Sequence, residues 1–156
     1  MAKLEVFPRR TLKLTNVVAK MVDNEDTSQM DKVVEMMDNY IKTKGSCPIG
    51  PLIHKVCADI SEEGEVIATV DCMRQCESHI HRVEAPYTTI PILKISNCLY
   101  LRFVGPENDV QYGYDKLRLY AYEEDIRLKK ESYTVFLGQE GDTITVDLFI
   151  EREDEV

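Results

Sequence analysis

Residues 132–150 have the pattern of a β-hairpin, and a strand pair of this kind needs a further layer to cover its apolar face. Two runs rich in β-branched and aromatic residues flank a polar turn that contains Gly138 and Gly141. Because the side chains of a strand point alternately to the two faces of a sheet, each run divides into two sets. One face of the sheet is apolar and the other mixes aromatic with polar side chains, which is what the floor of a ligand pocket requires.

The two strands of this hairpin place different residues on each face. In the first strand Tyr133 lies on one face, whereas Thr134 and Phe136 lie on the other. In the second strand Asp147 lies opposite an apolar set. That set is Ile144, Val146, Leu148 and Ile150.

The composition limits the class of protein. The chain has 156 residues, of which 44% are hydrophobic and 30% charged, and these values are typical of one globular domain. The net charge of -9 argues against direct binding to nucleic acid or to anionic membranes. No apolar run approaches the roughly 20 residues of a membrane span, and residues 1–10 lack the apolar core of a signal peptide. Five cysteines, an odd number, favour a reducing compartment, so we expect a cytoplasmic protein.

Alternation and turn residues predict further strands in the rest of the chain. The predicted strands are residues 3–7, 11–22, 52–60, 65–74, 92–93 and 97–104. The predicted breaks are Pro8, a turn-rich connector at 47–51, a hairpin turn at 61–64 and a linker at 75–91.

Two helices are predicted as well. The first follows an acidic turn at residues 23–26, carries apolar residues at spacings of three and four, and ends at Gly45. Its candidate caps are Asp26, Thr27 and Ser28. The second follows a turn at residues 105–108, has Asn108 as its candidate cap, and ends near residue 124 or 125.

The two halves of the chain follow the same order of strand, acidic turn, helix and hairpin. The tripeptide Thr-Val-Asp occurs in the last strand of each half, at residues 69–71 and 145–147. We therefore expect residues 1–156 to form one domain built by internal duplication of a βαββ unit, with lobes at about 3–76 and 88–152. The predicted fold class is α+β, with antiparallel sheets, two helices and a ligand cleft between the lobes.

Several short motifs occur in order along the chain. They are Gly50-Pro51-Leu52-Ile53-His54, Thr89-Ile90-Pro91, Gly105-Pro106, a helix with Tyr114, Leu117 and Tyr120, the strand Tyr133-x-x-Phe136, and the closing VDLFI. Together they resemble the GyrI-like small-molecule-binding family, which includes the effector-binding domains of BmrR-like multidrug regulators. The resemblance covers nearly all of the chain. It implies a duplicated βαββ fold with an aromatic-lined ligand pocket between the lobes.

The chain departs from this family at one position. Many members have a glutamate directly after the tyrosine that matches Tyr133, and the resemblance implies that this acid pairs with cationic drugs or serves a hydrolase of cyclopropane-bearing compounds. Here the position is Thr134. A threonine hydroxyl is neither a charge partner nor a general base near neutral pH. We therefore expect no catalytic residue at this position, and binding of a cation requires another acid.

Two aspartates are candidates for that acid. Asp147 and Asp71 occupy equivalent positions in the two predicted hairpins. Either they project into the central cleft and attract a cation, or they lie on the solvated face of a half-exposed sheet.

Aromatic residues are the second group of candidates. Tyr100, Tyr120, Tyr133 and Phe136 either wall a ligand pocket, where their rings stack on planar compounds and attract cations, or belong to the core. Core is the favoured interpretation for Tyr120, because its helix must pack on a sheet.

Four residues in CMRQCESHIH suggest a metal site, namely Cys72, Cys76, His79 and His81. Their spacing is not a familiar ligand spacing, and the resemblance implies no metal. We expect no metal site and no cofactor. His54 is interpreted as structural, and the acidic end at residues 151–156 as solvated.

The favoured hypothesis is a free-standing protein that sequesters or senses an aromatic or cationic small molecule through Tyr133, Thr134, Phe136, Tyr100, Asp147 and Asp71. The residues before the first strand are too few for a helix-turn-helix motif, so direct DNA binding is not expected. A hydrolase is the alternative, with Glu131, Asp147 or Asp71 in place of the missing glutamate. A third hypothesis is inhibition of a partner enzyme such as DNA gyrase. A monomer and a dimer are both compatible with the sequence.

Overall fold

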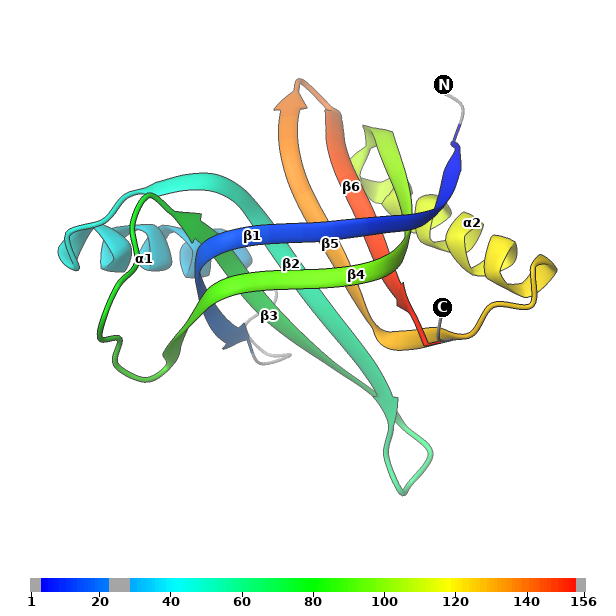
Figure 1. Ribbon diagram of the computed structural model, residues 1–156, viewed down its shortest axis with the longest axis horizontal. Coiled ribbons are helices and arrows are strands. Elements are labelled where there is room, and N and C mark those ends of the chain that lie inside the picture. The colour runs from blue at the N-terminus through cyan, green and yellow to red at the C-terminus, as the bar shows by residue number, and fades with distance from the viewer. Residues whose placement is uncertain (1–3, 23–28, 154–156) are drawn as a thin grey trace. The chain divides into compact units, whose positions relative to one another are not determined.

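A computed structural model of the chain describes residues 4–22 and 29–153 (Figure 1). Its elements are β1 (Val6–Val22), α1 (Met30–Thr43), β2 (Pro48–Ile60), β3 (Val66–Cys76), β4 (Tyr87–Pro106), the 3-10 turn η2 (Glu107–Asp109), α2 (Val110–Glu123), β5 (Leu128–Glu140) and β6 (Thr143–Arg152). The predicted α+β class, with antiparallel strands and two helices, is confirmed. The predicted turn at 23–26 and the caps Asp26, Thr27 and Ser28 lie outside the described residues. Neither α1 nor α2 has the length and apolar character that a membrane-crossing helix needs.

The chain divides into two compact units. The α2 unit consists of Met1–Leu12 and Ile95–Val156, and the α1 unit of Lys13–Lys94. The long strands β1 and β4 contribute residues to both. In the α1 unit β3 pairs with β1 on one side and β2 on the other. In the α2 unit β6 lies likewise between β4 and β5. The duplication and the cleft between lobes stay predictions.

A short motif in β1 recurs in β4. Residues 13–16 read Lys-Leu-Thr-Asn and residues 94–97 read Lys-Ile-Ser-Asn. Asn16 and Asn97 adopt the left-handed backbone region, with φ of 54° and 59°, which asparagine tolerates better than most residues. The same conformation at matching points of the two units supports the predicted duplication.

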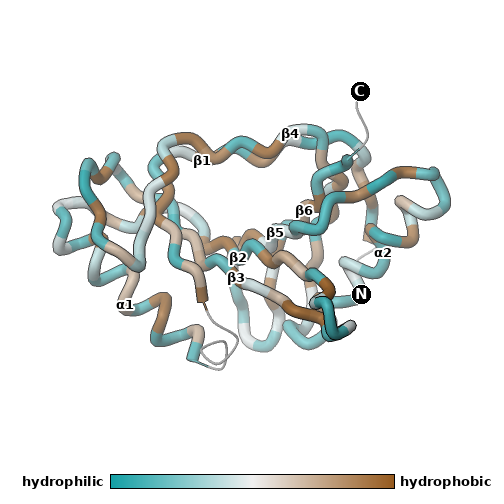
Figure 2. Tube along the Cα trace, turned by 90° about the horizontal axis from the view of Figure 1, so that it is seen from below, coloured by the Kyte–Doolittle hydropathy of each residue, from teal (hydrophilic) through white to brown (hydrophobic). Residues whose placement is uncertain are grey.

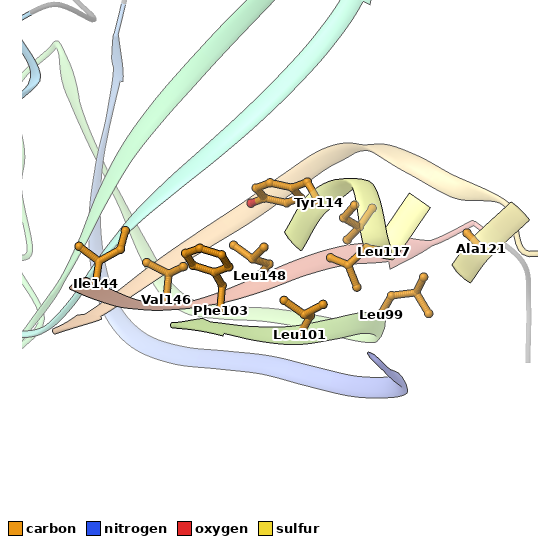
Figure 3. Close-up of a cluster of buried hydrophobic side chains, with 10 residues drawn as sticks. Leu99, Leu101, Phe103, Tyr114, Leu117, Ala121, Ile144, Val146 and Leu148 are labelled. Atoms are coloured by element: carbon orange, nitrogen blue, oxygen red, sulfur yellow. The ribbon is translucent and has the colours of Figure 1, made fainter. Parts of the chain in front are cut away.

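The apolar face of the final hairpin forms the core of the α2 unit. Leu101 of β4, Leu148 of β6 and Leu117 of α2 are fully buried there. Figure 3 shows the helix side chains Tyr114, Leu117 and Ala121 facing those of the strands. Their spacing of three and four residues puts them on one side of α2. The predicted apolar set Ile144, Val146, Leu148 and Ile150 lies in this core, and that prediction is confirmed.

Gly113 allows α2 to approach the sheet closely. A Cβ atom built on Gly113 would lie 2.6 Å from Cδ1 of Leu148 and 3.2 Å from Cδ2 of Leu101. These distances are too short for van der Waals contact. The absence of a side chain at Gly113 therefore sets how near the helix packs on β4 and β6.

The α1 unit has its own core between α1 and its sheet. Met37 and Ile41 of α1 are fully buried beside Cys72 and Cys76 of β3. In Figure 2 the tube alternates between apolar and polar along the strand β4 and along α1, as expected of elements with one buried side.

The strand ends predicted at proline residues were wrong. Pro8 was expected to close a strand, but β1 continues through it to Val22. The Pro8 carbonyl accepts a hydrogen bond of 3.2 Å from Nη1 of Arg152. This bond stabilises the strand at a residue that has no N–H to donate. The predicted connector at 47–51 was also wrong beyond its first residue, because β2 begins at Pro48. A register shift between Pro48 and Leu52 accommodates the prolines.

The predicted linker at 75–91 is shorter than expected. β3 runs on to Cys76 and β4 begins at Tyr87, so Pro91 lies inside a strand. The predicted hairpin turn at 61–64 is confirmed, with the Gly64 N–H donating to the Ser61 carbonyl at 2.9 Å.

The two helices end in the same way with different residues. α1 stops before Gly45, which has φ of 82°, and α2 stops before Asp125, which has φ of 57°. In both, an amide beyond this residue bonds back into the last turn, from Ser46 to Ile41 and from Ile126 to Ala121.

Substitutions at these two ends should therefore have opposite effects. Gly45→Ala should lower the free energy of unfolding by about 1 kcal/mol, because alanine is strained at positive φ. Asp125→Gly should raise it by about 0.5 kcal/mol, because that strain is relieved. Urea denaturation of both variants beside the wild type checks this pair. Effects of the same sign would contradict it.

Candidate ligand-binding site

The face of the α2-unit sheet that points away from α2 carries an aromatic group. Along β6 the core residue Leu148 alternates with Asp147 and Phe149. Phe149 lies across from Tyr100 of β4 and from Tyr133 of β5 in the strand register. The rings of Tyr100 and Phe149 are 5.0 Å apart and tilted by 35°, a favourable arrangement for an aromatic pair.

Phe7 and Arg10 of β1 extend this group. The Phe7 ring lies 5.7 Å from that of Tyr100. The guanidinium carbon of Arg10 lies 4.5 Å from the centre of the Phe7 ring and 5.4 Å from the centre of the Tyr100 ring. A guanidinium over aromatic faces is attracted by the ring quadrupole. We call Phe7, Arg10, Tyr100, Arg102, Asp147 and Phe149 the aromatic–arginine cluster.

Asp147 is the polar centre of the cluster. Its Oδ1 accepts hydrogen bonds of 2.8 Å from the Tyr100 hydroxyl and of 2.8 Å from Nε of Arg102. Its Oδ2 accepts one of 3.2 Å from Nη2 of Arg102. The Asp147 side chain is 14% exposed and that of Arg102 is 55% exposed. Both oxygens of the carboxylate are therefore engaged, and its charge is matched by one guanidinium.

The electrostatics of the cluster keep these groups in defined states. Burial raises the pKa of Tyr100, and the hydrogen bond to Asp147 raises it further. The phenol is therefore neutral near pH 7 and acts as a donor. The hydrogen bonds to Asp147 and its negative charge raise the pKa of Arg102, which stays cationic.

Thr134 and Phe136 lie on the opposite face from Tyr133. The Thr134 hydroxyl is hydrogen-bonded to the Tyr114 hydroxyl of α2 at 2.5 Å, and Phe136 packs against the core of the α2 unit. Thr134 is 8% exposed, and burial raises the pKa of Tyr114. The structure thus brings Tyr100, Asp147 and Tyr133 onto one face and places Thr134 and Phe136 against α2. Their roles in ligand binding stay predictions.

The remaining predicted candidates lie elsewhere. Asp71 belongs to β3 of the α1 unit, where its strand register pairs it with Met21 and Lys55. Tyr120 packs partly buried against the core of the α2 unit, in agreement with the favoured interpretation. Burial lowers the pKa of His54, which is half-buried in β2.

The cysteine and histidine residues of the suggested metal site are not gathered around a common point. Cys72 and Cys76 are buried in the core under α1, and burial raises the pKa of each thiol to about 11. The rings of His79 and His81 meet edge to face, 5.1 Å apart. Over residues 4–22 and 29–153 no group of three or more possible ligands could hold a metal ion.

Sequence reasoning missed Phe7, Arg10 and Arg102. Arg102 could have been identified, because a cation on one strand pairs well with an acid on the neighbouring strand, and the register places Arg102 opposite Asp147. Nothing in the sequence pointed to Phe7 or Arg10, because the strand was expected to stop at Pro8.

Two hollows of the α2 unit lie away from the cluster. One of about 440 Å³ is lined by Pro106, Glu107, Asn108, Gln139, Asp142 and Ile144. Another of about 380 Å³ is lined by Leu128, Lys129, Lys130, Glu131 and Glu153. Most of the residues that line these two hollows are polar or charged, and none is aromatic, so neither hollow offers a ring on which a planar compound can stack.

Several solved structures resemble this one despite very different sequences. EcmrR, seen in a cryo-EM structure of an EcmrR–DNA complex, matches 98% of this chain with a TM-score of 0.66 at 12% identity. The chain spans 57% of the length of EcmrR. An uncharacterized conserved protein from Listeria innocua matches 97% of this chain and 92% of its own, with a TM-score of 0.64 at 10% identity. A hydrolase from Listeria innocua covers the same shares, with a TM-score of 0.58 at 8% identity.

No protein-family model and no curated protein matches the sequence. At identities of 8–12% the likeness to solved structures shows the fold alone. The chain has the fold of these proteins over almost its whole length.

Proposed function

We propose that this protein binds a small aromatic compound on the aromatic–arginine cluster, as an effector-binding domain. The observation that carries the proposal is the row of three rings, Phe7, Tyr100 and Phe149, in which neighbouring centroids are 5.0–5.7 Å apart. Phe7 and Tyr100 are partly exposed and can meet a ligand, whereas Phe149 is buried and supports Tyr100. Rings of this kind offer both stacking area and a polar handle. The two guanidinium groups supply donors that can orient a bound compound, and the Tyr100 hydroxyl, whose proton is donated to Asp147, can accept a hydrogen bond from it.

Binding fits the cluster better than catalysis. A general base needs a free oxygen that reaches the proton it removes. Both oxygens of Asp147 are already occupied by Tyr100 and Arg102. Thr134 offers no acid, and its hydroxyl faces α2 instead of the cluster.

The comparisons support this proposal through the fold. EcmrR, of which a segment has the same fold, is seen bound to DNA, and the sequence motifs resemble those of effector-binding domains. The present chain would supply the part of such a protein that senses a compound. Cytoplasmic localisation, a protein partner such as DNA gyrase and the oligomeric state stay predictions.

The proposal predicts that binding of a neutral aromatic compound depends on Tyr100. We expect 2-naphthylmethanol to raise the melting temperature of the wild type saturably. Tyr100→Leu should weaken this binding about tenfold, because it removes stacking area and an acceptor. The matched control is Tyr112→Leu, which changes an exposed tyrosine of α2 and should leave binding unchanged. Isothermal titration measures both. Equal affinities for the wild type and Tyr100→Leu would overturn the proposal.

Hydrolysis is the second candidate, favoured by the Listeria hydrolase that shares the fold. Of the acids proposed to replace the family glutamate, Glu131 is half-buried and lines the 380 Å³ hollow. Turnover of ester or cyclopropane-bearing test compounds that disappears in Glu131→Gln would support this candidate. Saturable binding without turnover would count against it.

A further inference from the structure

We infer that the aromatic–arginine cluster selects aromatic compounds that carry a carboxylate, and discriminates against aromatic cations. This inference rests on the proposed function and adds the charge of the ligand. It reverses the expectation that Asp147 attracts a cation.

The charges on the cluster carry the argument. Asp147 is the acid of the cluster, and Arg102 holds it in a two-point pair. Arg10 adds a second cation over the rings, and none of the described carboxylates forms an ion pair with it. Nearby on β6, Glu151 is matched by Lys129 at 3.0 Å. The cluster therefore presents one positive charge that its own acid does not balance.

The position of Arg10 suits an aromatic acid. Its guanidinium carbon lies 4.5 Å from the centre of the Phe7 ring and 5.4 Å from the centre of the Tyr100 ring. A guanidinium carries five N–H donors in a fixed fork that matches the geometry of a carboxylate. A planar ligand beside these rings would bring its carboxylate within reach of Arg10, where two parallel N–H···O bonds can form.

A cationic ligand faces two costs in the same place. To reach Asp147 it must displace Arg102 from two charge-assisted hydrogen bonds and Tyr100 from a third. It must also approach Arg10, which carries the same charge. Asp147 is 14% exposed, so these interactions are weakly screened by solvent.

Three compounds with one ring system test the inference. We expect 2-naphthoate to bind more tightly than 2-naphthylmethanol, and 2-naphthylmethylammonium to bind most weakly, by isothermal titration. Arg10→Gln should weaken 2-naphthoate about tenfold and bring it to the level of the alcohol. Arg118→Gln is the matched control, because Arg118 lies 5.6 Å from the centre of the Tyr114 ring on α2 and should change nothing.

A further variant checks the role of Asp147. Asp147→Asn leaves Arg102 without its acid, so the ratio of the affinity for 2-naphthoate to the affinity for the alcohol should rise several-fold. If the ammonium compound binds the wild type best and loses affinity in Asp147→Asn, the inference is overturned and the proposed function stands. If none of the three compounds binds in a way that depends on Tyr100, both are overturned.

Discussion

Replacing Thr134 with glutamate should lower the free energy of unfolding by about 3 kcal/mol at pH 7. Position 134 is 8% exposed and faces the buried hydroxyl of Tyr114. A carboxylate there would lose its hydration inside the core of the α2 unit, and the tyrosine would satisfy it in part. The variant tests directly whether this chain can accept the acid that the resembling family carries.

The loss should depend on pH. Burial raises the pKa of an introduced glutamate above its ordinary value of about 4.3. The folded variant then binds a proton at a higher pH than the unfolded chain does, so its stability relative to the wild type should improve as the pH falls from 7 towards 5. Urea denaturation followed by circular dichroism measures this, since the chain contains no tryptophan.

Thr134→Val is the matched control for the charge. Valine keeps the shape of threonine and removes one hydrogen bond, so the expected loss is about 1 kcal/mol with no dependence on pH. If the free energy of unfolding of Thr134→Glu lies within about 0.5 kcal/mol of the wild-type value at pH 7, position 134 does not face the core.

Leu117→Ala should also lower the free energy of unfolding by about 3 kcal/mol. Leu117 is fully buried between α2 and the sheet, among Leu101 and Leu148. Its truncation removes apolar contacts and leaves a cavity that the surrounding close-packed side chains fill incompletely.

Leu119→Ala provides the comparison on the same helix. Leu119 is 56% exposed, so its truncation should change the stability by no more than about 0.5 kcal/mol. Both variants are measured by urea denaturation. Equal losses at the two positions would contradict the assignment of the buried side of α2.

The alternation of the last hairpin predicted much of the α2 unit. A period of two separated Leu148 from Asp147 and Thr134 from Tyr133, and the structure keeps each pair on opposite faces. Periodicity says which residues share a face, however, and not which face meets a helix. Thr134 therefore entered the sequence hypothesis as a ligand contact although it packs on Tyr114.

Long-range pairing limited the prediction of the site. Tyr100 and Asp147 were identified from their own strands, but their hydrogen bond depends on the register of β4 against β6. Arg102 was missed for the same reason. Phe7 and Arg10 join the cluster because β1 continues through Pro8. The Pro8 carbonyl accepts a hydrogen bond from Arg152. The sequence alone does not distinguish a proline inside an edge strand from a proline that ends a strand.

The central claim is that a small aromatic compound binds on the partly exposed rings of Phe7 and Tyr100, beside the buried ring of Phe149. The most direct test is a titration of isotope-labelled protein with 2-naphthylmethanol, followed by nuclear magnetic resonance of the aromatic and methyl groups. Ring currents from the bound compound should shift the resonances of Phe7, Tyr100 and Phe149 saturably and leave those of Leu117 unchanged. Shifts that are largest at Leu117 and Tyr114, with none at Tyr100, would contradict the claim.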